Sequence, residues 1–167
     1  LSCKIGKACY IPIGHDSKKN INKDIVLNKL KPLLEDPSIK KIGQNIKFDF
    51  IVLFKHGIKI SSMEDTMLMS YVLDAGKNRH NMDTLSQIHL NHKTIAFKDL
   101  VGSGKKEINF SKVDIEEAKD YAAEDADITY RLYKKFSKNL KEEKMINIYE
   151  VFEKPLIKIL AYMEIEG

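Results

Sequence analysis

One segment in the C-terminal half of the chain constrains the fold more than any other. From Asp114 to about Asn139, apolar residues recur at helical spacing, which predicts a long amphipathic helix with one face against a core. Acidic residues gather at its start and basic residues at its end, the polarity that stabilises a helix dipole. The predicted core-facing stripe comprises Ile115, Ala118, Tyr121, Ala122, Asp125, Ile128, Thr129, Leu132 and Phe136.

Asp125 does not fit an ordinary core stripe. Burying an ionised carboxylate without a partner is costly, and Glu124 and Asp127 beside it show that solvent-facing positions for acid were available. An earlier predicted helix has the same anomaly, because Asp49 lies within its apolar stripe. That stripe comprises Ile46, Phe50, Leu53 and Phe54. The sequence thus predicts two helices that each direct an aspartate inward.

A buried ion pair is the commoner explanation for either aspartate alone. Two such acids on separate helices favour a divalent metal site, since converging carboxylates repel one another unless a divalent cation lies between them. Oxygen ligands without nearby His or Cys suit Mg²⁺ or Mn²⁺ better than zinc. Tyr121 lies one turn before Asp125, so its hydroxyl is placed to orient an attacking water, although packing through the ring is the alternative.

The remaining segments alternate between strand and helix patterns. Strands are expected at residues 7–13, 39–43 and 58–60, and helices at 24–34, 44–56, 63–76 and 80–91. Asn45 and Gly57 are candidate start and stop signals of the second helix. The glycine-rich stretch at 102–106 lacks the spacing of a phosphate-binding P-loop, so residues 96–113 are expected to be a partly irregular loop.

Composition limits the class of protein. With 167 residues and 43% hydrophobic content, the chain can bury one core, so residues 1–167 are expected to form a single domain. The net charge of +4 is compatible with a polyanionic partner but does not require one. Cys3 and Cys9 lack the spacing of a zinc site, which fits a reducing cytoplasm. The longest apolar run, Phe50 to Phe54, is far too short to cross a membrane.

Several motifs closely resemble the 3′–5′ exonuclease (proofreading) domain of bacterial DNA polymerase I, a DEDD exonuclease with a tyrosine-type third motif. The stretch KIGQNIKFD, which ends at Asp49, resembles the second motif of that family, and YAAEDAD, with Tyr121 and Asp125, resembles the third. The stretches DTMLMSYVLDAGKNRHNMDTLS and HKTIAF also match. The resemblance covers nearly the whole chain and implies an RNase H-like α/β fold, a mixed sheet flanked by helices.

The resemblance also implies a function and a set of roles. It implies two-metal-ion hydrolysis at single-stranded DNA 3′ ends, with two Mg²⁺ or Mn²⁺ ions, in a proofreading module joined to a polymerase domain in a bacterial, nucleoid-associated cytoplasmic protein. Asp125 and Asp49 would hold the metal ions, and Tyr121 would orient the attacking water. The positions that match contacts to the bound strand are Gln44, Asn45, Arg79 and Phe97.

One family motif is absent from the sequence. The first motif, Asp-x-Glu on the first strand of the sheet, would lie upstream of Leu1, and the only Asp-x-Glu present, Asp114 to Glu116, has the position of helix N-terminal acid. We therefore expect a domain truncated at its N-terminus, with an unpaired sheet edge and a C-terminal helix that leads toward a polymerase domain. An RNA-processing exonuclease of the same superfamily, and a non-catalytic single-strand-binding or structural module, are the alternative functions.

Overall fold

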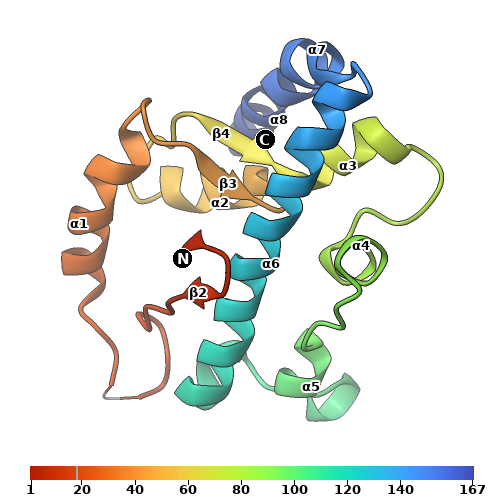
Figure 1. The fold of residues 1–167 in the computed structure, drawn as a ribbon. Helices are drawn as coiled ribbons and strands as arrows, with labels where there is room; N and C mark the ends of the chain where they lie inside the picture. The colour runs from red at the N-terminus through yellow and green to blue at the C-terminus, as the bar shows by residue number, and fades with distance from the viewer. Residues whose placement is uncertain (18) are drawn as a thin grey trace.

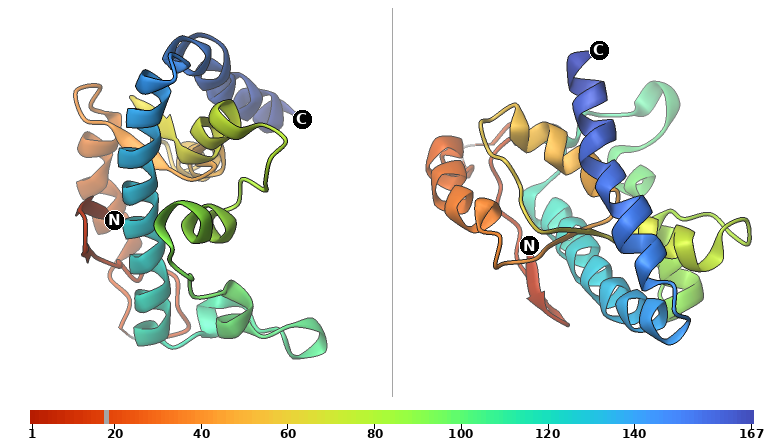
Figure 2. Two further views of the ribbon diagram at one scale, coloured as in Figure 1. Left: turned by 45° about the vertical axis from the view of Figure 1, so that its right-hand side comes forward. Right: turned by 90° about the horizontal axis from the view of Figure 1, so that it is seen from above.

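The computed structural model describes residues 1–17 and 19–167, and one long helix organises them. This helix, α6 (Ile115–Glu142), runs through the centre of the molecule with the other elements on either side (Figure 1). The N-terminal strands and α1 (Lys23–Glu35) lie on one side of it, and α3 (Thr66–Asp74), α4 (Met82–Leu90) and α5 (Phe97–Val101) lie on the other (Figure 2). The predicted long helix is confirmed, three residues longer at its C-terminal end than expected.

Four short strands form two separate sheets. β1 (Ser2–Lys4) pairs antiparallel with β2 (Lys7–Ala8), and β3 (Lys41–Gly43) pairs parallel with β4 (Met63–Asp65). Both sheets contact α6. Within the part of the chain that the structure describes, β1 and β3 each pair along one edge only, so each sheet presents the kind of unpaired edge that the sequence led us to expect.

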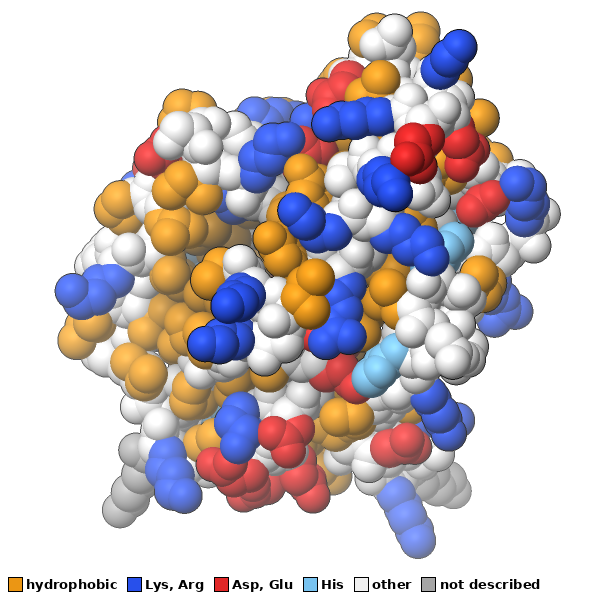
Figure 3. All heavy atoms as spheres, viewed as in Figure 1, with side chains coloured by type: hydrophobic (Ala, Val, Ile, Leu, Met, Phe, Trp, Pro, Cys, Tyr) orange, Lys and Arg blue, Asp and Glu red, His pale blue; other side chains and the backbone are white. Residues whose placement is uncertain are grey.

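The surface between these sheets is unusually apolar. Figure 3 shows hydrophobic side chains gathered in a hollow between α1 and the long helix. Helix α1 forms where residues 24–34 were expected to be helical, but it buries only Val26. Large exposed apolar residues include Leu1 and Ile5, on either side of β1, and Ile25 and Leu33 of α1. These elements therefore lack the covering that an amphipathic helix normally finds.

After α6 the chain continues in helices. α2 (Ile46–Phe54) and α8 (Lys154–Glu166) pack together, and α7 (Ile146–Ile148) and a π-helical turn (Tyr149–Glu153) connect α6 to α8. Two short 3₁₀ segments, Gly104–Lys106 and Phe110–Lys112, precede α6. Among the described residues, no helix combines the length and apolar character needed to cross a membrane.

The core is divided into clusters around α6 and α2. The largest cluster forms where the stripe of α6 meets α3 and α4, and it includes Met69, Leu73, Leu85, Ile128, Leu132, Phe136, Leu140 and Tyr149. A second cluster joins α2 to α8 and comprises Ile46, Phe50, Ile60, Met63, Ile157 and Ala161. The apolar stripes predicted for both helices are therefore the surfaces that pack.

The strand predicted at 58–60 is absent. Ile58 and Ile60 are buried as expected, but the Ile58 N–H bonds to the Leu53 carbonyl and the Ser61 N–H bonds to the Leu34 carbonyl, so helix ends satisfy this backbone. The paired strand lies at Met63–Asp65, inside the segment predicted to be helical. The strand expected at 7–13 is only two residues long, and α5 forms within the expected loop at 96–113.

A buried acid ties the C-terminal segment to β4. Glu64 is 3% exposed and accepts hydrogen bonds from the Tyr149 hydroxyl at 3.0 Å and the Lys154 ammonium at 2.9 Å, while Lys40 lies 3.3 Å away. The Tyr149 hydroxyl also accepts the Asp65 N–H at 2.9 Å. A charge buried at this depth needs such partners, and here it has them.

Candidate active site

Asp125 and Tyr121 lie on the same face of α6, as predicted, and both are half-buried. Burial raises the pKa of Asp125 to about 6; a hydrogen bond with Tyr121 lowers it, and the negative charges of Glu124 and Asp83 raise it further. Burial also raises the pKa of Tyr121, so its hydroxyl stays protonated at neutral pH. The pair thus presents a carboxylate and a hydroxyl whose environment disfavours further negative charge.

The acids around Asp125 have protein partners. Glu124 lies 2.7 Å from the His92 Nε2 and accepts the Ile95 N–H at 2.7 Å. Asp83 accepts the Thr94 hydroxyl at 2.6 Å. Glu124 therefore holds the loop between α4 and α5 against α6, and Asp83 ties the same loop to α4.

Asp127 is also paired, through an ion pair with Arg131 at 2.7 Å and the N–H of Gly6 at 2.6 Å. Asp125 differs from all of these neighbours. Apart from Tyr121, the described residues offer it no hydrogen bond and no ion pair.

Asp49 lies on α2 and is exposed, so the prediction that it points into the core is wrong. The reason is how α2 packs: Phe50 and Phe54 meet Tyr162 of α8, which leaves the face with Phe48 and Asp49 uncovered. Nearby protein atoms nonetheless desolvate the carboxylate and, with the charge of Asp65, raise its pKa to about 6. Since water reaches the side chain, this desolvation is partial, and the oxygens remain accessible to a ligand.

Asp65 sets the position of Asp49. Its carboxylate accepts the N–H groups of Asn45 and Ile46 at 3.0 Å, at the start of α2, and those of Met67 at 2.9 Å and Leu68 at 3.4 Å, at the start of α3. One buried carboxylate therefore caps two helices. Asp49 lies one turn into α2, so its location follows from this cap.

The described residues do not complete a metal site. Asp49 and Asp125 supply hard oxygen ligands of the type that Mg²⁺ prefers, but among the residues described no group of three acidic, His or Cys side chains is arranged to hold a metal ion. The acid that acts on Asp49 is Asp65, and those that act on Asp125 are Glu124 and Asp83. The predicted sharing of cations by Asp49 and Asp125 stays a prediction.

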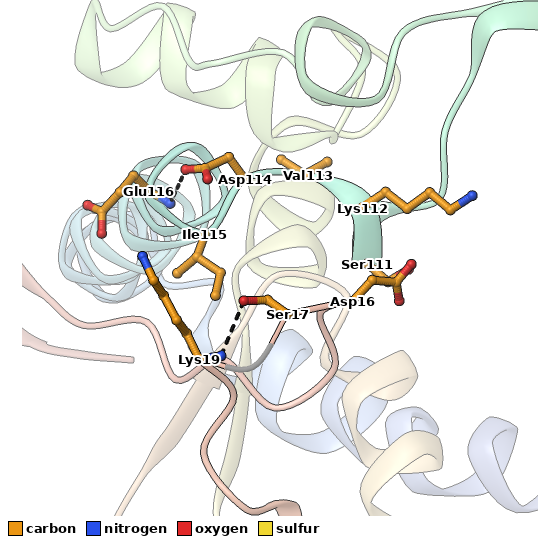
Figure 4. A pocket seen from close by; sticks show the side chains of 9 residues that line it. All are labelled: Asp16, Ser17, Lys19, Ser111, Lys112, Val113, Asp114, Ile115 and Glu116. Carbon is orange, nitrogen blue, oxygen red and sulfur yellow. Dashed lines mark hydrogen bonds between the residues drawn. The ribbon is translucent and has the colours of Figure 1, made fainter.

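Two hollows lie near the long helix. One, of about 350 Å³, is at the start of α6, where Asp114 caps the Glu116 N–H at 2.8 Å (Figure 4). This confirms that Asp114 and Glu116 are helix N-terminal acids, and they lie some 15 Å along the helix from Asp125. The other, of about 450 Å³, borders the site through Asp83 and is lined also by Thr84, Gln87, Ile88, Lys93, Thr94 and Ala96.

Comparison with known proteins identifies the family. A family model described as 3′–5′ exonuclease, of the DNA polymerase A type, matches residues 1–141. The chain belongs to this 3′–5′ exonuclease family. The resemblance drawn from the motifs at Asp49, Tyr121 and Asp125 is thereby confirmed.

The relatives of this exonuclease chain are longer proteins. It is 42% identical to DNA polymerase I of Rhizobium leguminosarum over 96% of its own length and 17% of that protein. It is 41% identical to DNA polymerase I of Pseudomonas aeruginosa, with 98% and 19% covered. The chain therefore spans less than a fifth of these relatives.

A solved structure shows the same fold. Brucella melitensis NrnC bound to pGG is 21% identical and superposes with a TM-score of 0.66 over 91% of this chain and 67% of that one. The match confirms the predicted RNase H-like α/β class. Two short sheets with helices on both sides are the form that this fold takes here.

By resemblance to the exonuclease family, four further side chains would lie along the bound single-stranded DNA. The structure shows the surroundings of each. Gln44 is occupied within the protein, since its amide donates to the His80 carbonyl at 2.8 Å and its oxygen accepts the Thr66 hydroxyl. Asn45 is exposed, has a left-handed backbone with φ 59°, and uses no side-chain bond to cap α2. Asn45 is the freer of the two to meet a ligand.

Arg79 and Phe97 are both exposed. Arg79 forms no ion pair with the residues that the structure describes, and 48% of Phe97 is accessible although its ring contacts two others. The sequence reasoning overlooked Asp65, Asp83 and Phe110, which shape the site. It took Glu124 to face solvent, and this was wrong, because Glu124 is mostly buried and bonds to His92 and Ile95. Asp65 alone had a sequence signal, an acid directly before the apolar run of α3.

Proposed function

We propose that this chain is the proofreading module of a DNA polymerase I, a two-metal-ion 3′–5′ exonuclease that hydrolyses phosphodiester bonds at single-stranded DNA 3′ ends. Membership of the exonuclease family supports the direction of cleavage. The names of the relatives support the link to a polymerase domain in the same parent chain. A cytoplasmic, nucleoid-associated location follows from that role.

One observation carries the proposal: among the described residues, the partly buried Asp125 has a hydrogen bond with Tyr121 but no cationic partner that offsets its charge. Glu124, Asp83 and Asp127 each have bonding partners, whereas burial and two neighbouring negative charges raise the pKa of Asp125 to about 6. A divalent cation would remove this electrostatic cost, as neighbouring Lys and Arg do elsewhere in the protein.

The roles follow from chemistry and position. Asp125 and the exposed carboxylate of Asp49 would hold the cations, and the protonated Tyr121 hydroxyl would orient the attacking water through a hydrogen bond. Bound cations would stabilise the charge on the attacking and leaving oxygens. Arg79 would meet a phosphate, and the exposed ring of Phe97 would stack on a base.

The complete site requires more acids than the described residues bring together. We propose that residues 1–167 belong to one exonuclease domain and that a strand carrying Asp-x-Glu lies between β1 and β3 in the parent protein. Support comes from the unpaired edges of β1 and β3, which both contact α6, and from the uncovered apolar surface of α1. Such a strand would join the two sheets into one.

The test uses the intact parent protein and a 5′-labelled single-stranded DNA, with Mg²⁺, with Mn²⁺ or with EDTA. We expect a ladder that shortens from the 3′ end only with metal, and its loss in Asp125→Asn. Asp120→Asn, an exposed acid on the same helix, is the matched control and should cut normally. Cleavage that persists in Asp125→Asn contradicts the proposal.

The same assay separates the alternatives. A matched RNA strand that is cut faster than DNA would favour an RNA-processing exonuclease. Strand binding without cleavage under any metal condition would favour a non-catalytic module, which is the second class of function that the sequence allows.

A further inference from the structure

Three aromatic rings meet beside Asp125. Phe97 of α5, Phe110 of the 3₁₀ segment and Tyr121 of α6 come from separate elements. The Phe97 and Phe110 rings are stacked, with centroids 5.9 Å apart and planes 19° apart. Tyr121 lies 5.9 Å from Phe97 and 6.3 Å from Phe110. Phe110 therefore contacts both side chains to which the proposed function gives a direct role.

The ring of His15, whose orientation is fixed by hydrogen bonds, packs against Phe110. The His15 ring centroid lies 5.8 Å from that of Phe110, and His15 is 7% exposed. Its Nδ1 is 3.1 Å from the Val113 carbonyl, and its Nε2 is 2.6 Å from the Tyr10 hydroxyl. Because a carbonyl can only accept, Nδ1 carries the proton and Nε2 accepts from Tyr10. With both nitrogens bonded, the His15 ring has one preferred orientation.

Phe97 and Phe110 differ in exposure. Phe110 is half-buried and packs on the small cluster of Val101, Val113 and Ala118. Phe97 is 48% exposed, so its stacked contact with Phe110 leaves part of the ring open to solvent. Phe110 is thus fixed in the protein, and Phe97 stacks on it while part of the Phe97 ring stays exposed.

We propose that Phe110 is a positioning residue that fixes Phe97 and Tyr121 relative to each other, so that the base stacked on Phe97 and the phosphodiester at Tyr121 are held in register. This inference rests on the proposed function. A ring that is already ordered loses little conformational entropy when a base stacks on it. Correct placement of the reacting group matters as much, because a displacement of 1 Å can lower a rate about 100-fold.

The test compares Phe110→Leu with Phe110→Tyr in the intact protein, using single-nucleotide release from a DNA 3′ end. In Phe110→Leu we expect KM to rise at least about fivefold, the lower end of what stacking of one base contributes. The value of kcat should fall as well, since Tyr121 loses a contact. Phe110→Tyr keeps the ring, so its KM and kcat should stay close to those of the wild type.

A control separates positioning from loss of stability. Leu100→Ala removes apolar contacts from the cluster on which Phe110 packs while it leaves all three rings in place. It should lower the unfolding temperature while kcat and KM stay unchanged. A 3′-terminal 2-aminopurine gives a readout without catalysis: its fluorescence should be quenched on binding to wild type in EDTA, and the quenching should be lost in both Phe97→Ala and Phe110→Leu.

A double variant tests the route of the effect. If Phe110 acts on binding through Phe97, Phe110→Leu should not raise KM further in a Phe97→Ala background. Independent, multiplying effects on KM would overturn the inference, as would unchanged KM, kcat and quenching in Phe110→Leu. If wild type binds but does not cut, the proposed function fails, and the quenching comparison alone still decides the role of Phe110.

Discussion

Replacing Asp125 by asparagine should stabilise the metal-free protein at alkaline pH while it abolishes cleavage. The wild-type carboxylate has a pKa of about 6 in the folded protein against 3.8 for an ordinary aspartate, because it is partly buried near Glu124 and Asp83. A folded-state pKa that is raised means that the protonated form favours folding. The stabilising contribution of the Asp125 carboxyl is therefore fully present below pH 3.8 and is lost as the pH rises through 6.

The magnitude follows from that shift. A difference of about two pKa units corresponds to about 3 kcal/mol between the protonation states. Asp125 is only half-buried, and solvent screening reduces the effect to about 1 kcal/mol. For a protein of this size, that is a rise in unfolding temperature of about 2–4 °C in Asp125→Asn at pH 8 without metal. At pH 4 the two proteins should unfold at nearly the same temperature.

Thermal unfolding at both pH values, with and without Mg²⁺, checks this expectation. Added Mg²⁺ should stabilise wild type by about 2.7 kcal/mol at a concentration 100 times its Kd, and should act much less on Asp125→Asn. The carboxyl of Asp49 titrates in both proteins, so its contribution cancels. Asp120→Asn serves again as the exposed control. An asparagine variant that is less stable than wild type at pH 8 in EDTA would refute the reasoning.

Three other substitutions test the site and its support. Tyr121→Phe removes one hydroxyl and should lower kcat by about 100-fold, the lower end for a positioned proton-handling group, with KM and unfolding temperature little changed. Asp65→Asn replaces the carboxylate that caps two helices and should lower the free energy of unfolding, measured by chemical denaturation, by roughly 3 kcal/mol. An unchanged free energy of unfolding would show that the cap does not stabilise the protein. Gly43→Ala would place a Cβ 2.8 Å from that of Ile46 and should destabilise by about 1–3 kcal/mol, whereas Gly14→Ala, with open space around it, should be neutral.

The helices could be predicted from the sequence because their signals are local. The stripe of α6 spans many turns and ends at recognisable charges, and α1 and α4 begin at polar residues that precede apolar runs. Strands gave weaker signals. Ile58 and Ile60 alternate as in a strand and are buried as in a strand, but the presence of a strand depends on a hydrogen-bonding partner, which periodicity does not reveal.

The role of each acid was harder to predict. Glu64 and Asp125 each stand next to another acid in the sequence, yet Glu64 is paired with Tyr149 and Lys154, which are 85 and 90 residues away. Asp49 shows the opposite failure: its helix packs on α8 through the predicted residues Phe50 and Phe54, but Asp49 lies at the edge of that stripe and is exposed. Partners distant in sequence decide both outcomes.

The positions of Asp49 and Asp125 relate the site to the way the core is divided. Asp49 is carried by α2, which belongs to the cluster shared with α8, while Asp125 is carried by α6, which belongs to the cluster shared with α3 and α4. Leu68 packs against both clusters, so the two helices are linked through α3 as well as through the Asp65 cap. Ligands that bind both carboxylates would therefore act across two packing units, and small shifts in either unit would change the geometry of the site. Asp65, which caps both α2 and α3, would therefore affect the geometry of the site without touching the reacting atoms.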